Sequence, residues 1–366
     1  MSKKLNQIRG RPVYVDLIRT VAMIGVIMLH ASGRWLITSQ ELSQMSHLEI
    51  VRWTVVDVYQ SMSVLSVPLF LMLTGALLLQ PKKQESLSVF FKKRWARIGL
   101  PFIFWTSAYF VWDFLVKDIP FNASVIIQGL LNGPYTHLWY MYVLVGLYLL
   151  TPILRIFVAH ADQTMMKYFV ILWFVGVATI PFFNLLTIFQ LHRDVFALTG
   201  YIGYFVLGAY LSTVKMRRRT SAALMIAGIA LTAFGTYVMA AADRGPEMYF
   251  FQEYLSPTVI LASVMVFMML LTVKPPTVQK DSAPSRLSKL VKLISQNTLP
   301  IYLFHVMIIE IIQQGYLGFT INRHTLNSII EIPLLTTIVL FVTLALILLW
   351  KKVPYFKRLI GCASNI

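Results

Sequence analysis

The chain has 366 residues, of which 57% are hydrophobic and only 13% are charged. That is too little polar material to cover a soluble globule of this size, so the composition indicates a polytopic membrane protein. The formal net charge of +17 could suggest a nucleic-acid partner. The basic residues, however, are spaced between apolar runs of about 20 residues, which membrane topology explains better than nucleic-acid binding. The single cysteine, Cys362, excludes an intramolecular disulfide and a cysteine-rich metal site, and we predict no metal.

Ten stretches have the length and apolarity of membrane-spanning helices. These predicted spans are 13–33, 53–79, 98–116, 138–158, 168–188, 196–214, 222–242, 254–273, 293–313 and 329–350. Segment 121–131 is too short to cross and is predicted to lie in the membrane interface. The linker-like loop 274–292 is too short to separate domains. We therefore predict one all-α transmembrane domain over residues 1–366.

The distribution of lysine and arginine sets the topology of these spans. Most of the 32 basic residues fall on the side that holds the N-terminal tail. The other side holds Arg34, Arg52, Lys117, Arg193, Arg244 and Arg323. The positive-inside rule then puts both termini in the cytoplasm, as ten spans require. A cleaved signal peptide is disfavoured for the first span because Arg19 interrupts its apolar core.

The first span carries an arginine and a histidine in an otherwise apolar segment. In a helix, Arg19 and His30 would lie roughly 16 Å apart along the axis and only about 20° apart around it. Asp16 falls near the same stripe and can pair with Arg19. Ionisable groups at membrane depth are functional candidates, and a neutral imidazole near the outer side can act as a general base. The alternatives are a hydrogen-bonded interfacial histidine and an arginine that snorkels to the helix end.

A second cationic pair, Arg94 and Arg97, lies in FFKKRWARIGLPFIFW at the cytoplasmic mouth of the third span. Three residues apart, they would share one helix face, and guanidinium forks suit phosphate groups. The alternative is an ordinary anchor for anionic lipids.

Aromatic residues open the fourth span at its outer mouth, in HLWYMYVLVGLYLLTPIL. Trp139 and Tyr140, which follow His137, are of the kind that stack on sugar rings. The alternative, an interfacial aromatic belt, is the commoner case.

Few acidic residues lie inside the predicted spans. Asp57, Asp113 and Glu310 all fall in outer halves, at the level of His30. One of them could orient the imidazole, and the sequence does not say which. His305, in LPIYLFHVMIIEII, is a further candidate.

Taken together, these stretches resemble the acyltransferase-3 family of integral membrane acyltransferases, within it the branch that O-acylates surface polysaccharides. The most specific elements are the Arg-x10-His pattern of Arg19 and His30 and the Arg-x-x-Arg pattern of Arg94 and Arg97. Weaker, mostly apolar blocks are VPLFLMLTGALLL from Val67, HLWYMYVL from His137 and IYLFH ending at His305.

The resemblance implies transfer of an acyl group, which we expect to be acetyl, from cytoplasmic acyl-CoA to a hydroxyl of an exported or lipid-linked polysaccharide. It implies His30 as the catalytic residue, with Arg19, Arg94 and Arg97 near the coenzyme; Trp139 and Tyr140 would line the acceptor's approach. The expected location is the bacterial inner (cytoplasmic) membrane, multi-pass, with membrane lipid, acyl-CoA and a surface glycan as partners and no nucleic acid. Two alternatives remain open, a transporter or flippase for a lipid-linked glycan and a structural assembly subunit.

Overall fold

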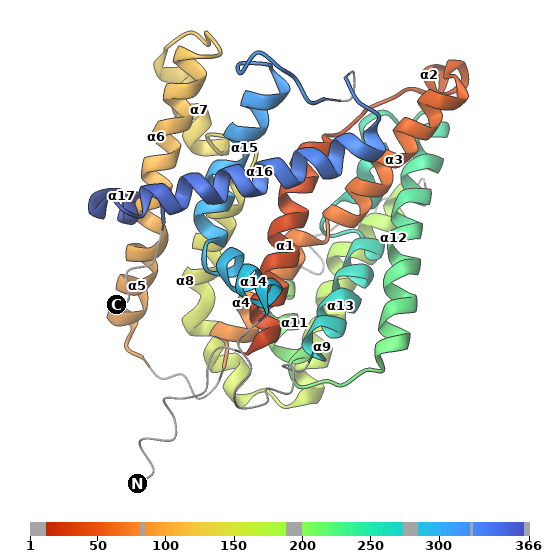
Figure 1. Cartoon of the computed structure of the whole chain (residues 1–366). Coiled ribbons are helices and arrows are strands. Elements are labelled where there is room, and N and C mark those ends of the chain that lie inside the picture. The colour runs from red at the N-terminus through yellow and green to blue at the C-terminus, as the bar shows by residue number, and fades with distance from the viewer. Residues whose placement is uncertain (1–11, 81–84, 188–199, 274–284, 323–324, 362–366) are drawn as a thin grey trace. The chain divides into compact units, whose positions relative to one another are not determined.

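The computed structural model describes residues 12–80, 85–187, 200–273, 285–322 and 325–361 (Figure 1). Every regular element in these ranges is a helix, which confirms the all-α prediction. Eight single helices or runs of consecutive helices in the described part are long and apolar enough to cross a membrane. Two shorter apolar helices, Ile202–Leu211 and Thr298–Gln313, correspond to the sixth and ninth predicted spans. About ten crossings result, and an even number places both ends of the chain on one side.

The chain forms two compact units. The first comprises residues 1–77, 161–298 and 321–336, and the second comprises 78–160, 299–320 and 337–366. Helices of the first unit are α1 (Val13–Ser32), α2 (Ser39–Gln44), α3 (His47–Ser63), α4 (Ser66–Leu78), α9 (Gln163–Phe174), η3 (Val175–Thr179), α10 (Ile180–Leu186), α11 (Ile202–Leu211), α12 (Arg218–Ala241), η5 (Gly245–Gln252), α13 (Pro257–Leu271) and α14 (Arg286–Gln296). Helices of the second are α5 (Leu87–Arg94), η2 (Trp95–Gly99), α6 (Leu100–Leu115), α7 (Ala123–Asn132), α8 (Trp139–His160), α15 (Thr298–Gln313) and α17 (Pro354–Leu359). Helix α16 (Ser328–Trp350) contributes residues to both units.

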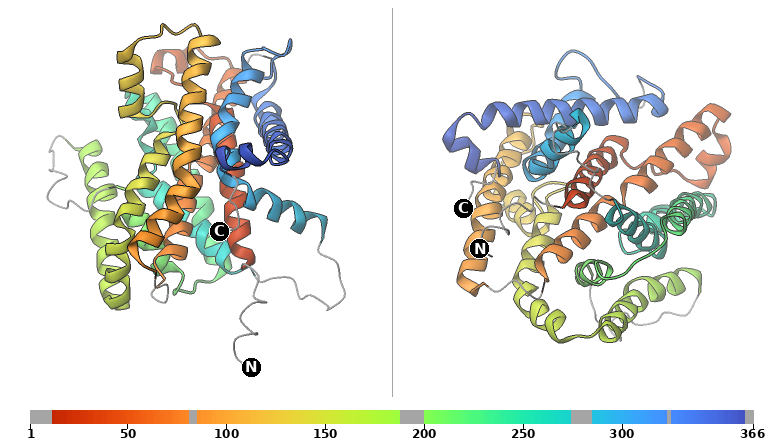
Figure 2. Two further views of the ribbon diagram at one scale, coloured as in Figure 1. Left: turned by 90° about the vertical axis from the view of Figure 1, so that its left-hand side faces the viewer. Right: turned by 60° about the horizontal axis from the view of Figure 1, so that its bottom comes forward.

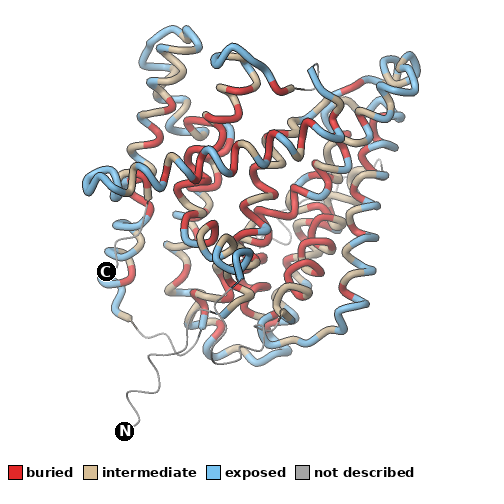
Figure 3. The backbone as a smooth tube through the Cα atoms, in the orientation of Figure 1, coloured by how far each residue is buried: buried red, intermediate tan, exposed pale blue. Residues whose placement is uncertain are grey.

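In the first unit, α1 packs against α3, α13 and α14, and α12 packs against α13 and α3. The outward side of α12 is exposed along its length (Figure 3). Ile226, Leu231 and Phe234 are among its exposed side chains. An exposed apolar face of this extent would be a liability in water, and it fits a helix that faces lipid.

Helices α4 and α11 approach each other more closely than ordinary side chains would permit. A Cβ added to Gly208 would lie 1.9 Å from the Met72 carbonyl oxygen, and one added to Gly75 would lie 1.8 Å from the Phe205 carbonyl oxygen. Glycine at each of these positions therefore allows backbone-to-backbone contact, as is common between membrane helices.

The second predicted span, 53–79, is broken into two helices at Val64 and Leu65. Pro68, in the first turn of α4, has no amide hydrogen to donate toward the Val64 carbonyl and its ring would clash with that carbonyl. A two-residue turn at Val64 and Leu65 therefore separates α3 from α4.

Two other prolines follow short π-helical turns. The π-turns Trp95–Gly99 and Val175–Thr179 each end two residues before a proline, Pro101 and Pro181. A widened turn relieves the clash between a proline ring and the preceding turn, so the helix continues. The third predicted span, 98–116, is consequently part of a longer helical rod from Leu87 to Leu115.

The ninth predicted span, 293–313, begins too early, and its first residues belong to a different helix. Helix α14 runs away from α1 at a steep angle (Figure 2, left) and ends at Gln296, and α15 starts at Thr298. The sequence of α14, RLSKLVKLISQ, alternates basic and apolar residues with helical spacing. Such a helix lies in the membrane interface rather than crossing it.

We predict that Gly208→Ala destabilises the protein by about 1–3 kcal/mol, because the new methyl group meets a main-chain oxygen that cannot move aside. The measurement is the thermal unfolding midpoint of the detergent-purified protein. Gly146→Ala in α8 is the matched control, since a Cβ there meets nothing within 4 Å. Equal midpoints for the two variants would contradict the close α4–α11 contact.

Candidate functional site

Helix α1 carries the arginine and histidine on one continuous rod. It is unbroken from Val13 to Ser32 and ends at Gly33, whose positive φ of 58° favours glycine. The predicted separation of Arg19 and His30, roughly 16 Å along one stripe, therefore applies. Both side chains are half-buried.

The N-terminal end of α1 is held by α14. The Ser295 hydroxyl donates to the Asp16 carboxylate at 2.6 Å. One helical turn further on, the Thr20 hydroxyl donates to the Val291 carbonyl at 3.0 Å. These bonds fix the end of α1 next to Arg19 against an interfacial helix.

The other end of α1 is held by Gln60 of α3. The buried Gln60 amide donates to the Leu29 carbonyl at 2.9 Å and to the Ser32 hydroxyl at 2.7 Å. The two acceptors flank His30 in the sequence, so Gln60 fixes the turn that carries the imidazole. Sequence reasoning missed Gln60, although a glutamine inside a predicted span is itself a signal.

Asp57, one of the acids considered as a partner of His30, has a defined partner of its own. Its carboxylate accepts a hydrogen bond at 2.6 Å from the Gln252 amide of η5, and both side chains are buried. Asp57 lies three residues before Gln60 and so shares a side of α3 with it. Helix α3 thus links η5 to the His30-bearing turn.

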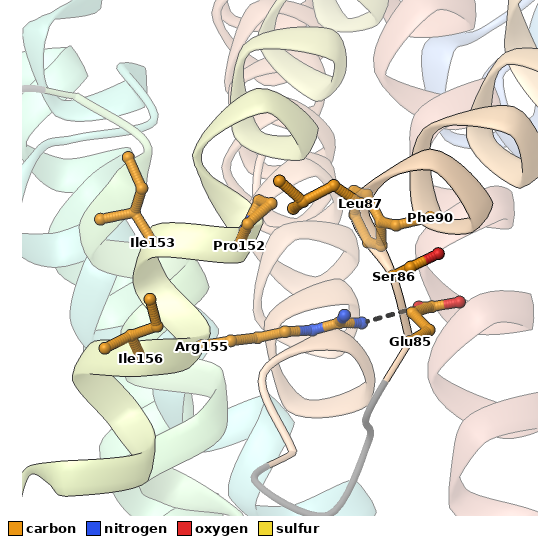
Figure 4. A pocket seen from close by; sticks show the side chains of 8 residues that line it. All are labelled: Glu85, Ser86, Leu87, Phe90, Pro152, Ile153, Arg155 and Ile156. Carbon is orange, nitrogen blue, oxygen red and sulfur yellow. Dashed lines mark hydrogen bonds and ion pairs between the residues drawn. The ribbon is translucent and has the colours of Figure 1, made fainter.

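In the second unit, Arg94 belongs to an ionic cluster around Glu85. Oxygen Oε1 of Glu85 lies 3.1 Å from Arg155 and 3.7 Å from Arg94, and Oε2 lies 3.1 Å from Lys93. Arg155 also donates from Nε to the Leu78 carbonyl at 2.8 Å. Figure 4 shows Arg155 reaching from α8 to Glu85. Three cations on one carboxylate leave a net positive charge of two.

The aromatic ring of Phe90 packs against the two arginines of this cluster. Its ring centroid lies 4.3 Å from the guanidinium carbon of Arg94 and 4.8 Å from that of Arg155. Phe90, Glu85 and Arg155 line a cavity of about 750 Å³ with Ser86, Leu87, Pro152, Ile153 and Ile156 (Figure 4). Neither Glu85 nor Arg155 was predicted from sequence, because their pairing joins segments far apart in the chain.

Arg97 differs from Arg94 in its surroundings. It lies within the π-turn Trp95–Gly99 and is exposed, whereas Arg94 is half-buried. The prediction that both arginines share a face assumed α-helical spacing, and the π-turn changes their angular relation. Turns of this kind occur frequently at functional sites.

A second cavity of the second unit, about 430 Å³ in volume, contains Trp139. It also contains Asp113 and Glu310, two of the acids considered from sequence, together with Lys117. Tyr140 does not line it. That side chain is buried, with its ring centroid 5.6 Å from that of Tyr302.

His305 is fully buried beside His137, with ring centroids 5.2 Å apart. Its Nδ1 lies 2.7 Å from the Tyr302 carbonyl oxygen and must donate to it, because a carbonyl only accepts. The Tyr302 hydroxyl in turn donates to the His137 carbonyl. These contacts hold the two imidazoles within an aromatic core.

The two cavities lie at opposite ends of the same helices. Along the rod from α5 to α6, Arg94 and Asp113 are roughly 28 Å apart, and along α8, Trp139 and Arg155 are roughly 24 Å apart. A hydrocarbon core is about 30 Å thick. The cationic cluster therefore belongs to one membrane face and the acidic cavity to the other, as the positive-inside rule predicts.

The described helices and sites are those of an integral membrane protein. A family model described as an acyltransferase domain matches residues 13–349. The chain belongs to the acyltransferase-3 family, as its motifs predicted, and is a membrane acyltransferase. Comparison with curated proteins and with solved structures gave no significant match.

The Glu85 cluster predicts a pH-dependent stability. Burial raises the pKa of the Glu85 carboxyl. The hydrogen bonds from Lys93 and Arg155 and the charges of Arg94 and Lys93 lower this pKa by more than burial raises it, so it lies below its ordinary value of 4.5. A depressed pKa stabilises the fold above about pH 4.5, and this stabilisation is lost as the pH falls through the folded-state value. Glu85→Gln should therefore cost about 1–3 kcal/mol at pH 7 and progressively less in acid.

The measurement is the unfolding midpoint of wild type and variant between pH 7 and pH 3. Glu253→Gln is the control, since Glu253 pairs with Arg34 at 3.2 Å on an exposed surface. Exposed pairs contribute little, so its midpoint should stay close to that of wild type. A constant difference between wild type and Glu85→Gln over the whole range would contradict the assignment.

Proposed function

We propose that this acyltransferase moves an acetyl group from cytoplasmic acetyl-CoA to a hydroxyl of an exported or lipid-linked polysaccharide. The proposed location is the bacterial inner (cytoplasmic) membrane, with the chain crossing it about ten times. The observation that carries the proposal is the unbroken α1, which presents Arg19 near its cytoplasmic end and His30 near its outer end on one stripe.

His30 is proposed as the general base. A neutral imidazole accepts the proton of the acceptor hydroxyl while its oxygen attacks the thioester carbonyl. The carbon–sulfur bond breaks, and the proton passes to the coenzyme A thiolate, so that an O-acyl ester and free coenzyme A are formed. Gln60, bonded to Leu29 and Ser32, would hold the imidazole in position.

The cations at the cytoplasmic end are proposed to hold the donor. Coenzyme A carries phosphate groups, which guanidinium forks bind bidentately. In the second unit, Arg94 is oriented by Phe90 and Glu85, and the exposed Arg97 is open to solvent. In the first unit, Arg19 supplies a further cation on α1.

The acceptor is proposed to arrive from the outer side. Trp139 lines the cavity at that end of α8, and Tyr140 packs behind it with a ring-centroid distance of 6.2 Å. An aromatic side chain at a cavity wall offers an apolar face to a sugar ring, so Trp139 is the proposed contact and Tyr140 its support.

We predict that His30→Ala lowers acyl transfer to glycan by about 10²- to 10⁴-fold, the usual contribution of a general base. Transfer is measured by mass spectrometry of the surface glycans and by release of free coenzyme A from acetyl-CoA. His160→Ala, at the exposed end of α8, is the matched control and should be fully active. Near wild-type glycan acylation by a well-expressed His30→Ala protein would exclude the assignment.

A further inference from the structure

The outer cavity of the second unit combines acids, one lysine and aromatic side chains. It is lined by Asp113, Lys117, Ile119, Asn132, Gly133, Pro134, Tyr135, Thr136, Trp139 and Glu310. Its volume of about 430 Å³ is within the range of small-molecule sites. What such a cavity binds depends on which of its hydrogen-bonding groups are still available.

The ammonium group of Lys117 already has three partners in the cavity. It donates to Glu310 Oε1 at 2.9 Å and to the Tyr135 hydroxyl at 2.5 Å, and it lies 3.4 Å from Asp113 Oδ1. Two of the three ammonium hydrogens are used in these hydrogen bonds, and the charge is also paired with the Asp113 carboxylate. Lys117 is therefore a structural cation that holds the cavity together, and the carboxylates of Asp113 and Glu310 beside it oppose the binding of an anion.

The carboxylates, in contrast, keep acceptor capacity. Glu310 accepts from Lys117 and, at 3.0 Å, from the Trp112 indole, and it is also hydrogen-bonded to Tyr135. Asp113 forms an ion pair with Lys117 through Oδ1, a buried atom that accepts no hydrogen bond among the described residues. A carboxylate has about four acceptor positions, and those on the second oxygen of Asp113, Oδ2, remain available to a ligand. The group that fits them is a hydrogen-bond donor.

The wall of the cavity is rigid and aromatic. Tyr135 stacks on Tyr109 with ring centroids 4.2 Å apart, and the buried Tyr109 hydroxyl donates to the Leu303 carbonyl at 3.0 Å. Trp139 supplies a second aromatic surface. Carboxylate acceptors beside an aromatic wall suit a ligand with several hydroxyl donors and an apolar face, which describes a sugar ring.

We propose that this cavity is the acceptor subsite and that it selects an uncharged, hydroxyl-rich sugar. Asp113 accepts hydrogen bonds from the sugar hydroxyls, and Trp139 covers a face of the ring. Two carboxylates and one lysine give a net charge of −1, so a uronic acid or a phosphorylated sugar is repelled. This inference rests on the proposed glycan acceptor and adds its chemical class and its binding residues.

The subsite lies far from the cations of the same unit. Asp113 and Arg94 are roughly 28 Å apart along the rod that contains both. The sugar therefore enters at the membrane face opposite to the Glu85 cluster.

The test uses purified protein, acetyl-CoA and a panel of methyl glycosides, namely glucoside, galactoside, N-acetylglucosaminide and glucuronide. Asp113→Asn keeps the size of the side chain and removes its charge. It should raise KM for the best neutral acceptor about tenfold, the effect of about 1.4 kcal/mol, because charged hydrogen bonds contribute about this much. KM for acetyl-CoA should not change, and discrimination against the glucuronide should fall.

Asp118→Asn is the matched control, because Asp118 is exposed and does not line the cavity. Its positive φ of 53° is one that asparagine also tolerates. If Asp113→Asn does not fold, Trp139→Leu, which leaves every bond of Lys117 in place, should raise the acceptor KM in the same way.

Two results separate the subsite from the proposed function. In the first, wild type acylates a glycoside while the acceptor KM of Asp113→Asn equals that of Asp118→Asn. That result would overturn the assignment of the subsite and leave the proposed glycan acyltransferase activity intact. If wild type acylates no glycan in cells or in vitro, the proposed acceptor fails. In that case the binding of methyl glucoside is measured by tryptophan fluorescence for wild type and Asp113→Asn. Binding by wild type that Asp113→Asn loses supports the subsite. Equal binding by both proteins, or no binding by wild type, overturns it.

Discussion

The structure depends on pairing its charged groups wherever they approach the hydrocarbon region. An ionised side chain without a partner is expensive there, so each one must find a counter-charge or a hydrogen bond inside its own unit. Glu85 is surrounded by Lys93, Arg94 and Arg155, and Lys117 is shared by Asp113 and Glu310. These pairings fix the positions of the helices that carry them.

The same need to pair charges places groups of opposite net charge at the two ends of the second unit. Antiparallel helices place a cluster with excess positive charge at one end and a cavity with excess negative charge at the other. Phosphates favour the first and sugar hydroxyls the second. In the first unit, α1 spans from Arg19 to His30, with α14 fixing its inner end and Gln60 its outer end. An acyl donor held by cations and an acceptor held by carboxylates would each find its own membrane face.

Local sequence patterns predicted the helices and the α1 stripe, because spacing in a single helix is set by its own geometry. Patterns failed where backbone chemistry interrupts an apolar run. Pro68 breaks the second span, and the third extends through a π-turn before Pro101. The start of the ninth span was wrong because the apolar residues Leu293 and Ile294 near the end of α14 come shortly before the apolar α15 in the sequence.

The partners of the candidate residues could not be predicted from the sequence for a different reason. Gln60 is bonded to α1, Arg155 to Glu85 and Lys117 to Glu310, and each pair joins segments that only tertiary packing brings together. Asp113 and Glu310 were recognised as unusual because acids inside spans are rare. That they share one cavity with Trp139 required the structure.

In the proposed mechanism, acyl transfer proceeds from a donor on the cytoplasmic face to an acceptor on the opposite face. Coenzyme A is too large and too charged to cross lipid, so in the proposed mechanism only its pantetheine arm would pass between helices toward His30. The decisive measurement uses sealed vesicles in which the protein has one known orientation. Acetyl-CoA supplied only on the cytoplasmic face should acylate a glycan presented only on the other face. Transfer that requires donor and acceptor in the same compartment would contradict this transfer across the membrane.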